Sequence, residues 1–120
     1  MEIVDANIVL RYLLNDHETF SVEAGKIIEN RQIQLPTEVC AEVVYVLQKV
    51  YEVPRQNINN SISLLLEYPN ITANKTVLKE ALKIYHTKNV DFIDSVLIAS
   101  NHVLGASIHT FDKKIKKLCH

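Results

Sequence analysis

The chain has 120 residues, of which 48% are hydrophobic and 22% are charged. This composition excludes a disordered chain, and the presence of only two cysteines excludes a scaffold held together by disulfides. No apolar run approaches the roughly 20 residues that a membrane-spanning helix needs, so we expect no membrane association. The length fits one domain over residues 1–120. Because the N-terminus has no basic leader, we expect a cytoplasmic protein.

Charge is unevenly distributed along the chain, although the net charge is only −1. Residues 1–74 carry five Lys and Arg against ten Asp and Glu, a net charge of −5, whereas residues 75–120 carry eight Lys against four acids, a net charge of +4. The densest positive charge is formed by Lys113, Lys114, Lys116 and Lys117. A basic edge of this kind attracts a polyanion such as RNA, although a solvated terminal helix has the same pattern.

The hydrophobic pattern predicts short strands separated by helices. In chain order, the expected elements are a strand at residues 3–4, helices at 8–14 and 18–29, a strand at 33–35, helices at 37–51 and 54–67, a strand at 71–72, helices at 77–85 and 91–104, a strand at 106–110 and a helix at 111–118. Strands alternating with helices predict an α/β fold, in which a short parallel sheet is flanked by helices on both faces. In such sheets, ligands bind beyond the carboxyl ends of the strands.

The third predicted helix is expected to be mostly buried. Thr37 is a suitable N-cap for it. Its expected buried stripe consists of Val39, Val43, Val46 and Val50, flanked by Cys40, Val44, Leu47 and Tyr51. Cys40 is therefore interpreted as a small buried hydrophobe rather than a reactive thiol. Farther along the chain, Gly105 is expected to end the helix at 91–104.

Four of the five aspartates fall where a predicted strand ends or a predicted helix begins. Asp5 follows the first strand, and Asp112 follows the strand at 106–110. Asp91 and Asp94 share the first turn of one helix because they are three residues apart. Residues in these places can converge on one pocket, although each aspartate taken singly also suits a helix cap or a contact with the helix dipole.

Glu42 and Asp94 strengthen the case for a shared site, because neither has an oppositely charged partner at helical spacing. A carboxylate placed beside apolar residues and another acid is destabilising unless a cation binds there. Several carboxylates with few nitrogen or sulfur ligands suit Mg²⁺ or Mn²⁺ rather than Zn²⁺. An acidic metal cluster beside a lysine-rich edge suits the hydrolysis of phosphodiesters.

Four segments, taken in order, resemble the PIN domain over essentially the whole chain. They are Asp-Ala-Asn at residues 5–7, Ala-Glu-Val-Val-Tyr-Val-Leu at 41–47, Val-Asp-Phe-Ile-Asp at 90–94 and Thr-Phe-Asp-Lys at 110–113. Their order and spacing look most like the small ribonuclease toxins of the VapC type. The resemblance implies a three-layer fold and an endoribonuclease that depends on Mg²⁺ or Mn²⁺ and is held inactive by a cognate antitoxin protein.

The resemblance also implies roles for individual residues. Asp5, Glu42, Asp94 and Asp112 match the acidic quartet that holds the metal and carries catalysis. Asn7 and Thr110 match polar supporting positions, and Asp91 is a further acid near the cluster. Two departures from the family are that Ala6 stands where Ser or Thr is common, and that Val96, Leu97 and Ile98 stand where small residues are usual. Neither departure removes a carboxylate.

Two other functions remain open at this stage. A phospho-receiver or an aspartate-nucleophile phosphatase also needs an acid after the first strand and a metal ion. Position 7 is Asn rather than a second acid, however, and no aspartate lies between Asp16 and Asp91. The second alternative is a non-catalytic binding module with the same fold, against which the complete acidic quartet argues. The valine- and leucine-rich helices exceed what a small sheet must cover, which predicts a homodimer.

Overall fold

The computed structural model describes every residue from Met1 to His120. It divides into two compact units, Met1–Asn74 and Lys75–His120. The first unit holds all three strands, and the predicted α/β fold with a short parallel sheet flanked by helices is confirmed. None of the helices combines the length and the apolar character that crossing a membrane requires. The expectation of one domain over residues 1–120 stays a prediction.

The sheet of the first unit consists of three strands of two residues each. They are β1 (Glu2–Ile3), β2 (Ile33–Gln34) and β3 (Ile71–Thr72), in the spatial order β1-β2-β3. Both pairings are parallel, with Glu2 opposite Ile33 and Ile33 opposite Ile71. Because parallel neighbours cannot be joined by a tight hairpin, each connection runs through helices.

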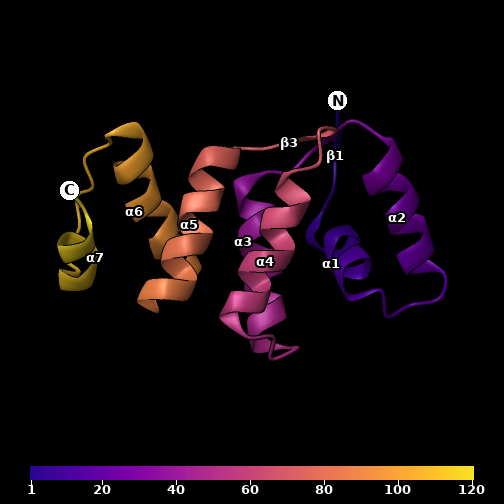
Figure 1. Cartoon of the computed structure of the whole chain (residues 1–120), viewed down its shortest axis with the longest axis horizontal. Helices are drawn as coiled ribbons and strands as arrows, with labels where there is room; N and C mark the ends of the chain where they lie inside the picture. The colour runs from indigo at the N-terminus through magenta and orange to yellow at the C-terminus, as the bar shows by residue number, and fades with distance from the viewer. The chain divides into compact units, whose positions relative to one another are not determined.

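Four helices form the connections of the first unit. They are α1 (Ala6–Leu14) and α2 (Phe20–Asn30) between β1 and β2, and α3 (Thr37–Lys49) and α4 (Arg55–Leu66) between β2 and β3. α1 packs beside α2, and α3 packs beside α4 (Figure 1). The fully buried aliphatic side chains of this unit include Val9, Ile28, Ile33, Val43, Val44, Ile58, Ile62 and Leu66. They come from β2 and from all four helices, so one apolar core joins these elements.

The structure corrects two expectations about α3. Pro36 is the N-cap and Thr37 is already the first helical residue, so Thr37 does not cap the helix. The buried residues are Cys40, Val43, Val44 and Leu47. Of the expected stripe, only Val43 is buried: Val39 and Val46 are half-buried, and Val50 is 65% exposed. Val50 is exposed because α3 ends at Lys49, so helical periodicity no longer orients the residues that follow.

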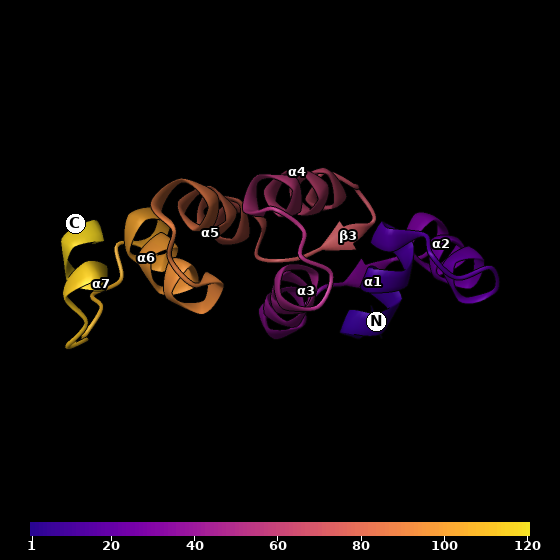
Figure 2. The same cartoon turned by 90° about the horizontal axis from the view of Figure 1, so that it is seen from below.

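The second unit contains α5 (Lys75–Lys88), α6 (Phe92–Leu104) and α7 (Lys113–Leu118). α5 packs along α6, and α7 lies against α6 (Figure 2). Between α5 and α6, the rings of Tyr85 and Phe92 meet edge to face, with their centroids 5.9 Å apart. Gly105 ends α6 in the left-handed conformation, with φ of 70°, as the sequence predicts.

The predicted strand at residues 106–110 is wrong. The second unit contains no strand, and a strand requires a neighbour that takes up its backbone hydrogen bonds. The carbonyl of Ala106 instead accepts a hydrogen bond of 2.9 Å from the side-chain amide of Asn101. Residues 106–110 still alternate between half-buried and exposed, and this is the pattern that suggested a strand.

Candidate active site

Asp5 follows β1 and begins α1, as the sequence predicts. Its Oδ1 accepts a hydrogen bond of 3.1 Å from the backbone N–H of Ile8, so the carboxylate is the N-cap of α1. Asp5 is exposed, and so is Asn7 in the first turn of the same helix. The capping bond fixes Asp5 through Oδ1.

A hollow of about 1150 Å³ opens beside Asp5 in the first unit. Its lining includes residues of β1 and α2, among them Glu23 and Lys26. Arg31, also in the lining, forms an ion pair with Glu2, with 2.9 Å between Nη1 and Oε1. The hollow therefore carries charges of both signs next to the Asp5 carboxylate.

Glu42 lies on the exposed side of α3, next to the buried Val43. Glu38 precedes it by one turn and is also exposed. Tyr45 follows it on the helix and is 62% exposed. Glu42 forms no ion pair, in agreement with the pattern of its neighbours in the sequence.

Three predicted acids of the second unit influence one another electrostatically. Asp94 is half-buried in the first turn of α6. Burial raises the pKa of its carboxyl group, and the negative charges of Asp91 and Asp112 raise that pKa further. The structure thus brings Asp91, Asp94 and Asp112 within electrostatic range, although Asp94 lies in the first turn of α6 and Asp112 lies beyond its end in the sequence.

Asp91 and Asp112 occupy N-cap positions but use them differently. The Oδ1 of Asp112 accepts a hydrogen bond of 2.9 Å from the N–H of Ile115, and its own N–H donates to Thr110 Oγ1 at 3.0 Å. The side chain of Asp91 makes no capping bond. Instead, the hydroxyl of Ser95 donates to the backbone carbonyl of Asp91 at 2.9 Å. The capping interpretation therefore holds for Asp5 and Asp112 and fails for the Asp91 carboxylate.

The four clustered lysines are all exposed on α7, but the ammonium group of one of them makes a hydrogen bond within the protein. Lys114 Nζ donates a hydrogen bond of 3.1 Å to the backbone carbonyl of Asn89. The ammonium of Lys116 lies 6.0 Å from the ring centroid of Phe111. The basic face offered to solvent is thus formed chiefly by Lys113, Lys116 and Lys117.

Neither unit by itself contains three or more His, Cys, Asp or Glu side chains placed to hold a metal ion. Asp5 and Glu42 belong to the first unit, and Asp94 and Asp112 belong to the second. The chemistry of these donors fits a hard cation, since all four are carboxylates. Their assignment as metal ligands stays a prediction.

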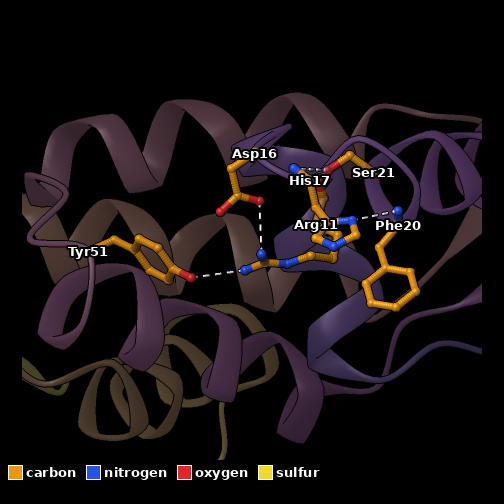
Figure 3. A network of polar contacts seen from close by, with 6 residues as sticks. All are labelled: Arg11, Asp16, His17, Phe20, Ser21 and Tyr51. Atoms are coloured by element: carbon orange, nitrogen blue, oxygen red, sulfur yellow. Dashed lines mark hydrogen bonds and ion pairs between the residues drawn. The ribbon is translucent and has the colours of Figure 1, made fainter.

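A polar network around Arg11 was not predicted from the sequence (Figure 3). Its Nη1 pairs with Asp16 Oδ1 at 2.9 Å, and its Nη2 donates to the hydroxyl of Tyr51, also at 2.9 Å. The bond to Tyr51 is the main reason that the Arg11 pKa is raised. The hydroxyl of Ser21 donates to the Arg11 carbonyl at 2.8 Å. The only sign of this network in the sequence was a single cation, Arg11, within the apolar segment 8–14. The network connects α1 with α2 and with Tyr51, which lies two positions beyond the end of α3.

His102 is the centre of a second network that the sequence did not reveal. Its Nδ1 lies 3.0 Å from Glu80 Oε2, and its Nε2 lies 2.7 Å from the carbonyl oxygen of Leu118. The imidazole also stacks on His120, with the ring centroids 4.2 Å apart. The hydrogen bond to Glu80 is the main cause of the raised pKa of His102. Because both ring nitrogens face oxygen acceptors, the doubly protonated imidazolium satisfies this environment best.

Comparisons with known proteins agree over almost the whole chain. The sequence model of a family described as "PIN domain" matches residues 3–120. The chain is 25% identical, over 127 aligned residues, to a protein named VapC ribonuclease from Aquifex aeolicus (strain VF5). That alignment covers 98% of this chain and 92% of the relative. No solved structure matches the chain significantly. The family match spans both compact units.

Proposed function

Because this chain belongs to the PIN domain family, we propose that it is a divalent-metal-dependent endoribonuclease and the toxin of a toxin–antitoxin pair. The family match over residues 3–120 carries the proposal, and the relative named VapC ribonuclease supports it. The match favours RNA hydrolysis over the receiver and phosphatase alternatives. A PIN-like module without activity would fail the cleavage test described below.

In this proposal Asp5, Glu42, Asp94 and Asp112 hold Mg²⁺ or Mn²⁺. When bound, such a cation supplies positive charge that stabilises the phosphate and makes water more acidic. Two observations support this assignment. All four donors are carboxylates, the ligands that hard cations prefer, and the repulsion that Asp94 experiences from Asp91 and Asp112 would be offset by a bound cation.

Asp94 is the carboxylate best suited to take a proton from the attacking water. Burial and the negative charges of Asp91 and Asp112 raise its pKa, which makes it a stronger base than an ordinary aspartate. Asp5 and Asp112 have less freedom, because each gives one oxygen to a helix N-terminus. Thr110 supports this arrangement by holding the backbone N–H of Asp112, and Asn7 offers a polar side chain in the turn after Asp5.

The test is cleavage of total RNA by the purified protein in the presence of Mg²⁺ or Mn²⁺. We expect discrete cuts that disappear in EDTA. The substitution Asp94→Asn should lower the rate by about 10²–10⁴-fold, the usual effect of removing a positioned acid–base group. The melting temperature should be unchanged or higher, because the substitution removes a half-buried charge that Asp91 and Asp112 repel.

Glu52→Gln is the matched control, because it also removes one negative charge, from an exposed position that does not line the hollow beside Asp5. It should cut RNA like the natural protein. Equal activity of Asp94→Asn and Glu52→Gln would refute the site assignment. Absence of cleavage by the natural protein, freed of any bound inhibitor, would refute the nuclease itself.

Two protein partners complete the proposal. A cognate antitoxin is expected because the relative is named for a toxin type that such proteins restrain. A second copy of this chain is the other expected partner, and large apolar side chains on the surface support it. They include Val22, Tyr45, Val50 and Leu64.

A further inference from the structure

Phe111 is the most exposed of the Phe and Tyr side chains, with 99% of the residue accessible. It lies between Thr110 and Asp112, the N-cap residue of α7. A buried Phe stabilises a fold through the large apolar area that it removes from water, and this ring removes almost none. The fold of the second unit therefore does not account for an aromatic residue at this position.

The ring lines one side of an open hollow of about 440 Å³. The other lining residues are Ile108, His109, Thr110 and Lys116. This volume falls within the roughly 300–1,000 Å³ of sites that take small organic groups. Since the hollow combines an aromatic face with polar groups, it suits a flat, partly polar ring.

Positive charge surrounds the same ring. The ammonium of Lys116 lies 6.0 Å from the ring centroid, and Lys113 and Lys117 are exposed on the helix that begins two residues later. Lys114 differs from these three, because its ammonium is bound to the carbonyl of Asn89. The cations next to Phe111 can therefore contact an anion without breaking a bond within the protein.

An aromatic face beside exposed lysines is the combination by which proteins hold single-stranded nucleic acid, with a base on the ring and phosphates on the cations. An acidic peptide would satisfy the lysines but offers no flat partner for the ring. Membrane insertion requires a longer apolar helix face, and α7 has six residues with Ile115 as its one buried residue.

We propose that Phe111 is a stacking platform for one base of single-stranded RNA, with Lys116 binding an adjacent phosphate. The inference rests on the proposed ribonuclease function and adds a contact that positions the substrate. Because Asp112 directly follows Phe111, a base held on this ring places the RNA backbone next to one of the proposed site carboxylates. Phe111 is a positioning residue and takes no part in bond cleavage.

The experiment measures binding of a fluorescent single-stranded oligoribonucleotide to the full chain in EDTA, where no cleavage occurs. Phe111→Leu keeps an apolar side chain but removes the aromatic face. It should weaken binding by about tenfold or more, the effect expected from losing one stacked base. Phe111→Trp should restore or tighten binding. Leu104→Ala, which trims another exposed apolar residue of the same unit, should bind like the natural protein.

The role of Lys116 is tested by the salt dependence of the same binding. Lys116→Gln should reduce the slope of log affinity against log salt by about 0.7, the value for one phosphate contact with a single strand. Lys83→Gln, an exposed lysine on α5, should leave that slope unchanged. Heparin has sulfates but no bases, so its binding should weaken in Lys116→Gln and not in Phe111→Leu.

Photo-cross-linking gives a direct readout. RNA that carries 5-bromouridine should attach to the peptide containing Phe111, as located by mass spectrometry. Equal binding by Phe111→Leu and Leu104→Ala, a cross-link at another place, or an equal loss of heparin binding in Phe111→Leu would overturn the inference. RNA binding that depends on Phe111 without any cleavage would support the platform while refuting the nuclease, so the two failures are distinguishable.

Discussion

At the scale of single residues, Asp5 and Asp112 combine a structural and a proposed catalytic role. Each gives one carboxylate oxygen to the first turn of a helix, and the second oxygen makes no hydrogen bond within the protein. Loss of such a cap typically costs about 0.5–2 kcal/mol, whereas Asn caps a helix about as well as Asp. Exchange to Asn therefore removes the charge while keeping the cap, and exchange to Ala removes both.

The sequence predicted the positions of these residues better than their contacts. Asp5, Asp91 and Asp112 each precede a helix, as expected from the pattern. Their local sequences did not reveal which carboxylate would cap its helix, because capping depends on the rotation of the side chain. The carboxylates of Asp5 and Asp112 accept a hydrogen bond from a backbone N–H, whereas that of Asp91 does not. The networks of Arg11 and His102 also lay beyond prediction, since Tyr51 and Glu80 are distant from them in sequence.

His102 should make the stability of the protein dependent on pH near neutrality. Its pKa is raised above 6.5 in the folded state, chiefly by Glu80, so the folded protein holds the proton more tightly than the unfolded chain. The stabilisation is complete below the unfolded pKa and is lost as the pH rises through the folded pKa. We expect the free energy of unfolding, measured with urea, to fall across that interval.

His102→Gln should remove this pH dependence and lower the free energy of unfolding at pH 6 by roughly 1–3 kcal/mol, the cost of losing charged hydrogen bonds. His86→Gln serves as the control, because the imidazole of His86 makes no hydrogen bond or ion pair. This variant should keep the pH profile of the natural protein. An identical pH profile for His102→Gln and the natural protein would show that the Glu80 contact is not maintained in solution.

At the scale of secondary-structure elements, local signals proved sufficient for helices and insufficient for one strand. Asp5 and Gly105 mark helix ends through contacts within a few residues, which the sequence contains. A strand depends on a distant partner, so alternation alone at residues 106–110 led to a wrong prediction. The buried stripe of α3 was predicted incorrectly for a related reason, because a pattern of valines fixes neither where a helix ends nor which side of it faces the core.

Alanine substitutions at the two glycines of the chain should change the stability of the protein in opposite directions. Gly105 has φ of 70° and nothing within 4 Å of an added Cβ, so Gly105→Ala should cost about 1–2 kcal/mol through backbone strain alone. Gly25 lies inside α2, where an added Cβ would meet only the Tyr12 ring at 3.9 Å. Gly25→Ala should therefore stabilise the protein by about 0.5–1 kcal/mol. Urea unfolding of both variants checks this, and shifts of equal sign would contradict it.

At the scale of the whole molecule, the change in charge along the sequence coincides with a structural boundary. The acidic part of the chain, with a net charge of −5, is the unit Met1–Asn74, and the basic part, with +4, is the unit Lys75–His120. Composition alone revealed the asymmetry but not the division, because a change of charge can equally fall within one compact body. The proposed RNA contacts all lie in the basic unit, as electrostatic attraction requires.

The exposed apolar side chains lead to a prediction about assembly. We expect a measured mass of twice 13.7 kDa by light scattering after size-exclusion chromatography, because a second copy would cover part of this surface. The mass should stay constant on moderate dilution. A single species of 13.7 kDa at all concentrations tested would contradict the homodimer.

The burial of Cys40 makes α3 observable by simple thiol chemistry. Only 1% of Cys40 is exposed, and burial raises its thiol pKa to about 12, so the reactive thiolate is scarce while α3 stays packed. Cys119, the other free cysteine, is half-buried. An alkylating reagent should therefore modify Cys119 first and reach Cys40 only when α3 opens. The slow phase of the reaction then measures how often the helix that carries Glu42 leaves its place.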